Sequence, residues 1–523
     1  MEPPPPSPIP ARRPGDLVSL LLDPVVARGD GDLPALRWSG GWWSYDELAG
    51  AAGAAAGWLA SRGVRRGHIL LVTVPDSPEW VALFLGASRI GAVVAPLSPD
   101  IAPARRMAAA ARLGADMTVA EEPDVRLGPR GLAVRELRHA IVTGIPDPGP
   151  AAVRPGDLAH LLLTSGSAGR PRWARHRAGD IPACIATYGR RVLRLRPGDV
   201  TWSAASLSTG YGLGNTLALP LGAGAAAAVP DRGRTPADCA RDCAHHGVTT
   251  LFGVPTSWAR LARDIDDGHV AAGAFSGVRT AVSAGEPLPP RVWAAVHRTL
   301  GLRLLDGLGS AETSHLYLSA RPGGARPGTV GWPVPGYQVR LRHPGPGAAE
   351  GEGELVVAGP TIMDGYHGED GFGPVDWRGW LPTGDIVRRE PDGGYRFVRR
   401  KGDRFKAGGA WVDADRVAGV LRGAREVTDV IVIPVPDREG LLQVGAAVAA
   451  TGDAPHGVAP RLAARAAEHL PPHEVPRALV VMDALPTNPS GKVDRAEVLR
   501  RLTARLAALT TADGPRPPRA GRP

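Results

Sequence analysis

The sequence predicts an α/β protein with a large N-terminal domain and a small α+β C-terminal domain. Over roughly the first 325 residues, alanine-rich stretches with helical spacing alternate with short aliphatic runs, a pattern typical of βαβ units. From about 325 to 400, short strand-like runs are separated by glycine turns, which indicates a β-barrel-like subdomain. From about 400 the alternation of helix and strand patterns resumes.

The elements of the N-terminal part follow from hydrophobic periodicity. Helices are predicted at 45–62, 79–91, 236–246 and 290–300. Strands are predicted after them, at 68–74, 92–97, 248–254 and 303–308. The longest apolar run, 217–230, is too short to span a bilayer and contains two prolines and two glycines. It is predicted to be a buried strand pair or a strand with a turn.

The same patterns place the domain boundary near 400. Strands at 353–358 and 394–398 belong to the barrel-like part, about 325–400. Beyond it, helices are predicted at 416–421 and 459–470, and strands at 427–434 and 442–449. The prediction is therefore an N-terminal domain over 15–400 and a C-terminal domain over 401–510. Proline-rich tails, 1–14 and 511–523, are predicted to be disordered.

Composition excludes several classes of protein. With 43% hydrophobic and 22% charged residues, the 523-residue chain is neither mostly disordered nor fibrous. Three cysteines cannot form a disulfide framework, which favours the reducing cytoplasm. The net charge of +9 comes from arginines interspersed with acids rather than from a clustered basic stripe, so nucleic acid is not an expected partner. No signal or membrane segment is visible.

The strongest local motif is the segment 163–172, LTSGSAGRPR. Hydroxyls, glycines and arginines at this density can surround a phosphate group. The segment is not a Walker loop, because no GK[ST] follows at the required spacing. It is not a nucleophile elbow either, because residue 165 is Ser where that motif needs Gly. Taken alone, it could equally be an ordinary flexible turn.

Four further segments favour nucleotide chemistry. Residues 306–312 follow a predicted strand and end in Glu312, whose carboxylate could hold Mg²⁺. Residues 381–385 place Asp385 in a turn where it could bind a ribose diol, and 400–409 form a basic, glycine-containing junction. Residues 486–492 deliver Lys492, one of only three lysines in a chain that otherwise uses arginine. A retained lysine indicates that a compact ammonium is needed there.

In their order and spacing, these segments resemble the adenylate-forming superfamily of acyl-CoA synthetases, peptide-synthetase adenylation domains and luciferases. The resemblance covers about residues 30–505 and is greatest to benzoate-CoA ligases and related aryl-CoA ligases. The segments that carry this closer resemblance are 203–205, 211–215, 251–256, 283–289, 306–315 and 331–337.

The resemblance implies a two-step reaction. A carboxylate attacks the α-phosphate of ATP to give an acyl-adenylate, and a thiol, usually that of CoA, then displaces AMP. Lys492 would bridge the substrate carboxylate and the α-phosphate, and Glu312 with Thr164 would hold Mg²⁺. The implied phosphate-binding residues are Thr164, Ser165, Gly166, Ser167, Gly169 and Arg172. The implied adenine- and ribose-binding residues are Gly285, Glu286, Pro287, Asp306, Gly307, Asp385 and Arg400.

The resemblance also implies an acid pocket and a moving C-terminal domain. The pocket residues would be Gly210, Tyr211, Gly212, Ser283, Gly309, His315 and Leu316. Rotation of the small domain about Gly402 would withdraw Lys492 and bring Gly408 and Gly409 to the pantetheine tunnel.

The chain departs from the family pattern at four places. Arg172 replaces the usual lysine, Ala311 replaces a threonine before Glu312, and Gly402 replaces the hinge aspartate. Ser208-Thr209-Gly210 stands where benzoate ligases have two aromatic residues. Small hydroxylated residues there predict a roomier, more polar pocket, and hence an aryl acid that carries amino or hydroxyl groups.

Structural roles remain open for several of these residues. Lys492 could be a solvated surface residue, Glu312 a structural acid, and His315 a core histidine. Lys401 and Lys406 could contact phosphates or simply be solvated.

A metal site is a further alternative at the cysteines. Cys239 and Cys243 lie near His245 and His246. However, Thr235-Pro236 begins and Gly247 ends a predicted helix there, so the two cysteines are expected to pack in the core.

Three functions remain in view. The favoured one is an aryl-CoA ligase that uses ATP, Mg²⁺ and CoA on an aromatic acid. The second passes the acyl group to a separate carrier protein, an amine or another small nucleophile. The third is a catalytically weakened homologue that binds nucleotide or an aryl acid as a sensor. A homodimer is also left open.

Overall fold

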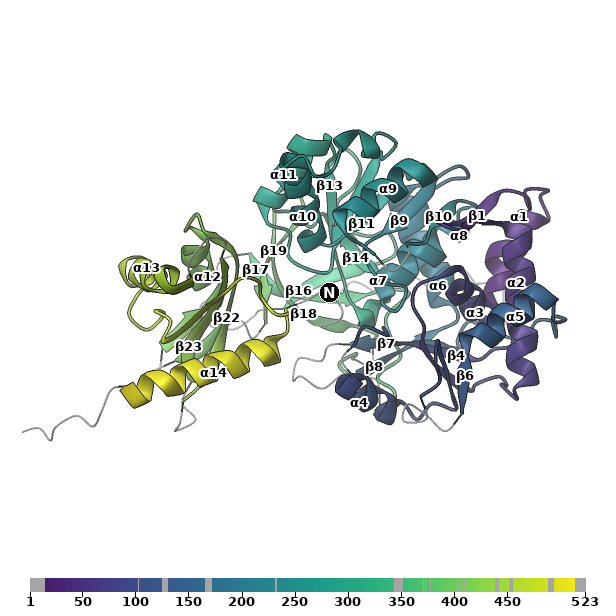
Figure 1. The fold of residues 1–523 in the computed structure, drawn as a ribbon, viewed down its shortest axis with the longest axis horizontal. Coiled ribbons are helices and arrows are strands. Elements are labelled where there is room, and N and C mark those ends of the chain that lie inside the picture. Colours follow the sequence, from purple (N-terminus) through teal and green to yellow (C-terminus); the bar gives the residue numbers. More distant parts are fainter. Residues whose placement is uncertain are drawn as a thin grey trace, which may run out of the picture. The chain divides into compact units, whose positions relative to one another are not determined.

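The structure is a computed structural model. It describes residues 15–101, 103–124, 130–164, 172–230, 233–342, 351–369, 371, 373–376, 378–401, 404–407, 410–437, 442–450, 455–487 and 493–512. The chain divides into two compact units, Met1–Val398 and Arg399–Pro523. Their helices and strands are labelled in Figure 1. The mixed α/β class predicted from the sequence is confirmed.

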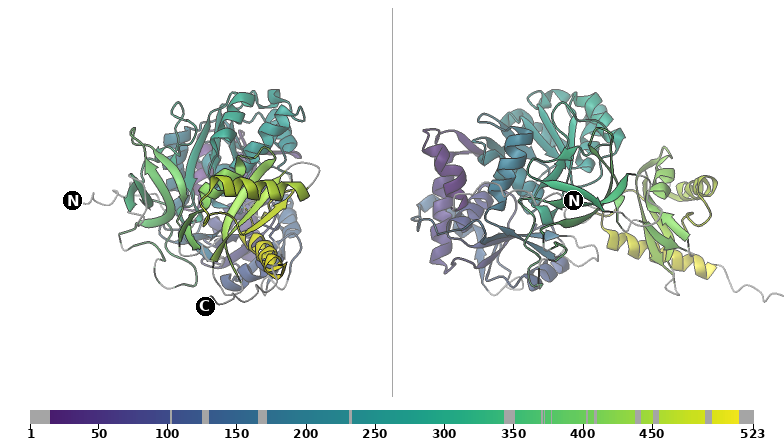
Figure 2. Two further views of the ribbon diagram at one scale, coloured as in Figure 1. Left: turned by 90° about the vertical axis from the view of Figure 1, so that its left-hand side faces the viewer. Right: turned by 180° about the vertical axis from the view of Figure 1, so that it is seen from behind.

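The first unit contains a six-stranded sheet. Its strands are β3 (Ile69–Thr73), β4 (Val93–Pro96), β5 (Met117–Ala120), β6 (Gly131–Ala133), β7 (Leu158–Thr164) and β8 (Arg172–Arg177). They follow the order β6-β5-β3-β4-β7-β8, and only the pair β7–β8 is antiparallel. The helices around it are α2 (Tyr45–Ser61), α3 (Pro78–Arg89), α4 (Pro103–Leu113) and α5 (Val134–Thr143). Helix α2 contacts both α3 and α5 (Figures 1 and 2).

The first unit also contains a nine-stranded sheet. Its strands are β1 (Pro34–Trp38), β2 (Gly41–Ser44), β9 (Val200–Ser203), β10 (Ala226–Ala228), β11 (Thr250–Gly253), β12 (Thr280–Ala284), β13 (Leu304–Gly309), β14 (Leu316–Ser319) and β15 (Trp332–Pro333). Strands β13, β12, β11, β9, β10 and β1 are parallel, with β2, β14 and β15 antiparallel at the edges. Helices α9 (Pro236–His246), α10 (Pro255–Asp266) and α11 (Pro290–Leu300) alternate with its strands.

Where the sequence predicts a barrel-like subdomain, the described strands form a four-stranded antiparallel sheet. The strands are β16 (Gln338–Arg342), β17 (Glu352–Ala358), β18 (Leu381–Arg389) and β19 (Tyr395–Arg400). The second unit contains the hairpin β20 (Arg404–Ala407) and β21 (Ala410–Asp413), and a three-stranded sheet of β22 (Val427–Pro436), β23 (Leu442–Ala450) and β24 (Ala478–Met482). Its helices are α12 (Ala414–Arg422), α13 (Pro455–His469) and α14 (Arg495–Ala512).

The prediction of a buried strand pair, or a strand with a turn, at 217–230 is correct for the second half of the run and wrong for the first half. Its first part is helical, in the π-helical segment Gly214–Ala218 followed by α8 (Leu219–Leu221), and only β10 is a strand. Nearly every residue of the run is buried. A segment that is apolar on all sides carries no periodicity, so a buried helix cannot be told from a buried strand by its pattern.

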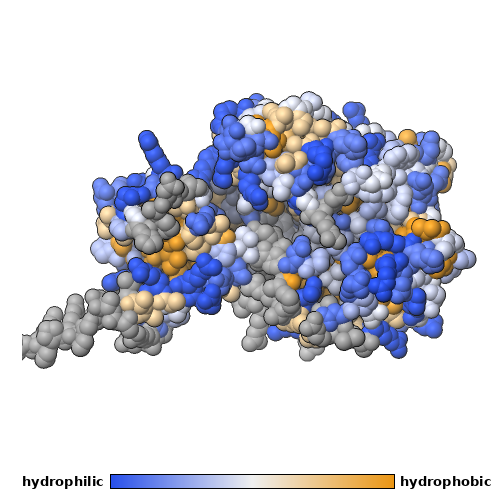
Figure 3. Space-filling model, in the orientation of Figure 1, coloured by the Kyte–Doolittle hydropathy of each residue, from blue (hydrophilic) through white to orange (hydrophobic). Residues whose placement is uncertain are grey.

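The surface of the first unit in Figure 3 is mostly hydrophilic, with separate apolar patches. Trp42, Val142 and Leu442 are the large hydrophobic side chains most exposed in the described part of the chain. No described helix is both long and apolar enough to cross a membrane.

Candidate active site

The segment that joins β13 to β14 is a short turn around Glu312. Residues 311–313 form a single 3₁₀ turn between Ser310 and Ser314 (hereafter the Glu312 turn, residues 310–314). The Ser310 N–H donates to the Thr313 hydroxyl at 3.0 Å, which begins the turn. Ser314 ends it with φ +62°, a conformation that non-glycine residues rarely adopt. Such a backbone persists only where its surroundings hold it in place.

Two of those surroundings come from the loop after β17. The Met363 N–H donates to the Glu312 carbonyl at 2.8 Å, and the Thr361 hydroxyl donates to the Thr313 carbonyl at 2.5 Å. Both donors lie about 50 residues further along the chain, so the turn is fixed by tertiary structure.

The Glu312 side chain is held by a tyrosine that the sequence analysis did not find. The Tyr366 hydroxyl donates to Glu312 Oε1 at 3.0 Å. Burial, and to a smaller degree the Glu312 charge, raise the pKa of Tyr366, so the hydroxyl remains protonated as a donor. The guanidinium of Arg172 stacks on the ring of the same tyrosine, 3.8 Å from the ring centre. This is a cation–π arrangement. Tyr366 therefore brings Arg172 and Glu312 to one place.

Thr164 and Arg172 stand at the ends of two paired strands. Thr164 ends β7, Arg172 begins β8, and the two residues are directly opposite in the antiparallel register. The Thr164 hydroxyl is buried and has no hydrogen-bond partner in the described part of the chain. The predicted phosphate residues between them, Ser165, Gly166, Ser167 and Gly169, lie outside the described residues.

The side-chain oxygen atoms of Glu312 and Thr164 are of the kind that a magnesium ion takes as ligands. Mg²⁺ takes oxygen ligands, typically one or two protein oxygens together with substrate phosphates and water. The Glu312 carboxylate could supply one such oxygen, and the unpartnered hydroxyl of Thr164 could supply another. Strand β7 packs against the Glu312 turn, so both lie in the same part of the unit.

The residues predicted to line the adenine lie on β13 and directly after β12. Ser283 pairs with Asp306 and Ala284 with Gly307 in parallel register. Asp306 is buried, which raises the pKa of its carboxyl group, and it accepts the Gly307 N–H at 3.0 Å. The carboxyl ends of parallel strands, beside a crossover, are where open α/β sheets bind ligands.

The segment after β12 is tied to helix α10. Gly285 adopts φ +91°, and Pro287 is exposed. The Glu286 carboxylate accepts the Thr256 hydroxyl at 2.7 Å. Glu286 is thus engaged within the protein and helps to fix this edge.

Asp385, predicted to bind ribose, lies on β18 and is buried. Its carboxylate accepts the hydroxyl of Tyr317, a residue of β14, at 3.0 Å. Arg400, predicted to act with it, is an exposed residue of the second unit.

Of the predicted acid-pocket residues, Tyr211 packs against His315. The ring of His315 lies 5.5 Å from that of Tyr211 and 5.1 Å from that of Tyr188. The side-chain amide of Asn215 donates to Ser203 at 3.4 Å, so its oxygen accepts from His315 Nε2 at 3.0 Å. Burial lowers the pKa of His315 to about 3, and the ring is neutral.

Two polar atoms of residues predicted to line the acid pocket are left without partners. His315 Nδ1 and the Ser283 hydroxyl are buried and have no hydrogen-bond partner among the described residues. Since Nε2 of His315 carries the proton, Nδ1 is an acceptor. A buried polar atom without a partner carries a free-energy cost, which a ligand of suitable chemistry would remove.

At two positions of the predicted acid pocket, a neighbouring backbone segment comes so close that only glycine fits. A Cβ on Gly210 would lie 2.5 Å from the Ser314 carbonyl oxygen, and one on Gly309 would lie 2.6 Å from that of His315. At both positions the absence of a side chain lets the backbone pack closely against Ser314 or His315, which follow Glu312. Gly212 and Leu316 are buried beside them.

The hydroxyls of Ser208 and Thr209 form hydrogen bonds within their own loop, so they do not support the prediction that they make the pocket more polar. Ser208 bonds to the Ser206 hydroxyl at 3.0 Å, while Thr209 donates to the Ser206 carbonyl at 2.8 Å and accepts the Gly212 N–H. The loop is anchored by Asp76, which accepts the Ser206 hydroxyl at 2.8 Å and forms an ion pair with Arg234. The unpartnered polar atoms of the pocket come from other residues.

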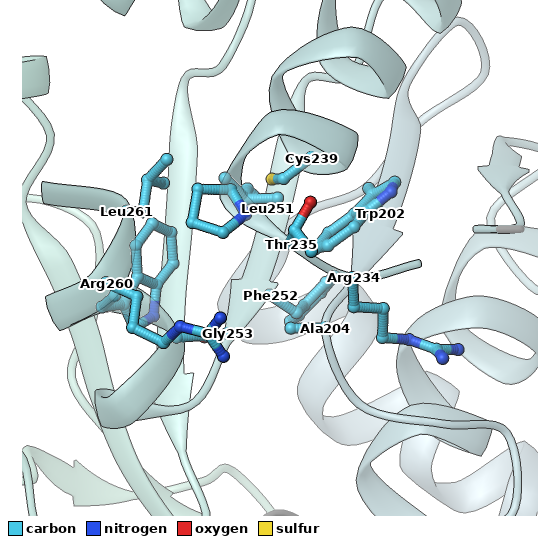
Figure 4. A pocket seen from close by; sticks show the side chains of 13 residues that line it. Trp202, Ala204, Arg234, Thr235, Cys239, Leu251, Phe252, Gly253, Arg260 and Leu261 are labelled. Atoms are coloured by element: carbon cyan, nitrogen blue, oxygen red, sulfur yellow. The ribbon is translucent and has the colours of Figure 1, made fainter. Parts of the chain in front are cut away.

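A separate pocket opens beside this cluster (Figure 4). It shares Phe252 and Gly253 with the contacts of Tyr211, and Arg234 and Arg260 lie on opposite sides of it. It encloses about 40 Å³ accessible to water. An engineered cavity that binds benzene measures about 150 Å³, so this pocket admits water but no aromatic ring.

The cysteine prediction is confirmed. Thr235 caps helix α9, Gly247 ends it in the left-handed conformation, and Cys239 and Cys243 are buried in the core. The described part of the chain contains no group of three or more His, Cys, Asp or Glu side chains that could hold a metal ion.

The remaining predicted residues belong to the second unit. Lys401 is exposed and Lys406 lies on β20. Lys492, Gly402, Gly408 and Gly409 lie outside the described residues.

Sequence analysis missed three residues that build the site, namely Tyr366, Tyr317 and Asp76. Each contacts a partner at least 54 positions away in the chain, so none of them carried a local signal. Asn215 lies in the segment 211–215 singled out from the sequence, but its role as the partner of His315 was not predicted.

Comparisons with known proteins agree with this geometry. Residues 24–367 match the family model of AMP-binding enzymes, and residues 417–492 match that of the AMP-binding enzyme C-terminal domain. An anthranilate–CoA ligase of Pseudomonas aeruginosa is 33% identical over 488 residues, which are 85% of this chain and 89% of the relative. A 4-hydroxybenzoate–CoA/benzoate–CoA ligase of Rhodopseudomonas palustris is 31% identical over 88% of this chain and 89% of the relative.

A solved structure extends the similarity to three dimensions. The benzoate CoA ligase of Burkholderia xenovorans superposes with a TM-score of 0.79 at 27% identity, over 92% of this chain and 99% of that one. The family model alone matches more than half of the chain. The chain therefore belongs to the AMP-binding enzymes of the adenylate-forming superfamily, and within them it is similar to the benzoate-CoA ligases.

Proposed function

We propose that the protein activates a substituted aromatic carboxylic acid with ATP, through an acyl-adenylate, and transfers the acyl group to CoA. One observation carries the proposal. A single turn presents Glu312 toward Arg172 and Tyr366, and, three residues later, His315 toward Tyr211. A carboxylate suited to a metal–phosphate group and a ring-lined pocket thus adjoin, as the joining of an aromatic acid to a nucleotide requires.

On the phosphate side, Arg172 and the segment after Thr164 would bind the β- and γ-phosphates. Glu312 and Thr164 would hold Mg²⁺, which when bound offsets the negative charge of the phosphates. Tyr366 keeps the Glu312 carboxylate and the Arg172 guanidinium in place, so both charges are oriented before the nucleotide arrives.

On the nucleotide side, residues 285–287 with Asp306 and Gly307 would line the adenine. Asp385 would bind the ribose, held in position by its hydrogen bond from Tyr317. Arg400 would assist from the second unit.

On the acid side, the aromatic ring would lie beside Tyr211 and His315. The unpartnered acceptor His315 Nδ1 favours a ring that carries a hydrogen-bond donor, such as an amino or hydroxyl group. Benzoate without a substituent would leave that acceptor unpaired.

The second unit would supply the groups that change between the two steps. Lys492 would stabilise the charge that develops as the carboxylate attacks the α-phosphate. Rotation near Gly402 would then replace it with the Gly408-Gly409 loop at the thioester-forming site.

The first test is release of pyrophosphate from ATP and Mg²⁺ across benzoate, its amino and hydroxy derivatives, and cinnamates, with and without CoA. We expect release with at least one substituted benzoate, and an aryl-CoA thioester by mass spectrometry when CoA is present. Pyrophosphate without thioester would move the proposal to another acceptor, such as a carrier protein. No release with any acid would contradict it.

A second test separates the two steps. Lys492→Ala is expected to abolish adenylate formation while thioester formation from supplied acyl-adenylate continues at close to the unaltered rate. Equal loss in both steps would refute the role given to Lys492.

A further inference from the structure

A buried histidine on β8 contacts the backbone of the Glu312 turn. His176 Nε2 lies 2.7 Å from the carbonyl oxygen of Ala311, and Nδ1 lies 3.0 Å from Asp180 Oδ2. Both partners are oxygen acceptors, so the ring is fully satisfied when both of its nitrogens donate. The Arg177 N–H also donates to Asp180 Oδ2, at 3.2 Å. A carbonyl oxygen can only accept, so His176 donates to Ala311 from Nε2, while Asp180 holds the other ring nitrogen.

This contact completes the fixation of the turn. The three consecutive carbonyls of Ala311, Glu312 and Thr313 accept from His176, Met363 and Thr361 respectively. Within the segment itself, the Ser314 N–H donates to the Ala311 carbonyl at 3.4 Å and the His315 N–H donates to the Thr313 carbonyl at 2.7 Å. Residue 311 is alanine, so its side chain offers no hydrogen bond, and the 2.7 Å contact from His176 to its carbonyl is shorter than the one from Ser314.

A second histidine beside it provides a contrast. His160 on β7 is buried, and its ring stacks on that of His176, with centroids 4.9 Å apart and planes 14° apart. Neither nitrogen of His160 has a hydrogen-bond partner among the described residues. Burial, with the nearby His176 as a smaller cause, lowers the pKa of His160, so this ring is neutral. The two rings stack on each other, and of the two only His176 has a hydrogen bond to the turn.

We propose that His176, supported by Asp180, is a positioning residue for the Glu312 carboxylate. Its hydrogen bond to the Ala311 carbonyl fixes the backbone from which Glu312 extends toward the metal–triphosphate group. The inference rests on the proposed function only through the role of Glu312 as a metal ligand. Removing the bond would leave the fold in place and loosen the carboxylate, just as loss of an outer-shell partner weakens a metal site.

The test measures how much Mg²⁺ strengthens ATP binding. Calorimetry on the full chain gives the Kd of ATP in EDTA and in excess Mg²⁺, and the ratio of the two is the metal gain. We expect His176→Leu to reduce the metal gain by about 10-fold to 100-fold, while the Kd in EDTA changes by less than about 3-fold. His176→Gln keeps one N–H donor and is expected to restore part of the gain.

His160→Leu is the matched control. It removes an equally buried, stacked ring without touching the Ala311 carbonyl, so the metal gain should stay within about 3-fold of the unaltered protein. Two outcomes would show that His176 only packs against its neighbours. One is an equal loss of metal gain in both leucine variants. The other is a His176→Leu variant whose ATP binding is weakened by the same factor in EDTA and in Mg²⁺.

Two further arms keep the test decisive. If circular dichroism shows that His176→Leu does not fold, Asp180→Asn replaces it in the test. This variant keeps the His176 ring and weakens only the contact between Asp180 and His176 Nδ1. An unchanged metal gain there would overturn the inference. The assay needs neither aryl acid nor CoA, so failure of every acid to release pyrophosphate leaves it intact. An unaltered chain whose ATP affinity does not respond to Mg²⁺ would overturn it directly.

Discussion

The Glu312 turn and the proposed acid pocket around His315 are neighbours in sequence and opposites in hydrogen bonding. In the turn, each of the three carbonyls from 311 to 313 accepts a hydrogen bond, and the Glu312 carboxylate accepts one from Tyr366. Among the residues of the proposed pocket, His315 Nδ1 and the Ser283 hydroxyl are buried with no partner in the described part of the chain.

The difference follows from what each region is proposed to bind. ATP and its metal are the same in every turnover, so a fully bonded, rigid turn is suited to them. An acid is selected by its substituents, and polar atoms left open in a buried pocket reject ligands that cannot pair with them. If this is correct, changes in the turn should act equally on all acids, and changes in the pocket should reorder them.

The largest effect is expected from Glu312→Gln. Loss of the carboxylate charge should lower the rate of pyrophosphate release by about 100-fold or more, because a metal ion contributes several kcal/mol to charge stabilisation. The reduction should be the same factor for each acid that the protein accepts. Pyrophosphate assays across the acid panel check this, and an acid-dependent factor would break the comparison.

His315→Phe should instead change the ranking of acids. The variant loses the acceptor Nδ1, so kcat/KM for amino- or hydroxybenzoates should fall toward that of benzoate by about 10-fold, the value of roughly one hydrogen bond to a buried group. It also leaves the Asn215 oxygen unpaired, which should destabilise the fold by about 1–3 kcal/mol. An unchanged order of acids in the folded variant would show that His315 does not contact the ring.

The same histidine predicts a pH dependence of stability. Burial lowers the pKa of His315 to about 3, below its usual value near 6.5. Below pH 6.5 the unfolded chain binds a proton that the folded chain does not, so stability falls as pH falls from 6.5 toward 3. Each such group contributes up to about 1.4 kcal/mol per pH unit. Denaturant unfolding of the His315→Phe variant between pH 6.5 and 5 should show a correspondingly shallower loss; an identical slope would contradict the assignment.

The smallest effect is expected from Tyr366→Phe. The change removes one hydrogen bond to Glu312 and keeps the ring under Arg172, so the rate should fall by about 5-fold to 10-fold, near 1 kcal/mol. The factor should again be independent of the acid. A rate equal to that of the unaltered protein would show that Tyr366 does not orient the carboxylate.

Local signals made most of the first unit predictable. Helix α9 begins and ends at the residues predicted, because Thr235, Pro236 and Gly247 are a cap, a first-turn proline and a left-handed terminator. Helix α2 likewise begins at Tyr45, behind the capping box of Ser44 and Glu47. The helical part of 217–230 was not predictable, since burial on all sides removes the periodicity that distinguishes a helix from a strand.

The sequence by itself determined the order of elements, the family, and the positions of Glu312, Asp385 and His315, because these depend on local spacing and on motifs along the chain. Only the tertiary structure decided what holds them. Tyr366, Tyr317 and His176 meet their partners across 54, 68 and 135 positions. Such contacts leave no periodic trace in the sequence, and each arises only when the strands and loops that carry the two residues fold against one another.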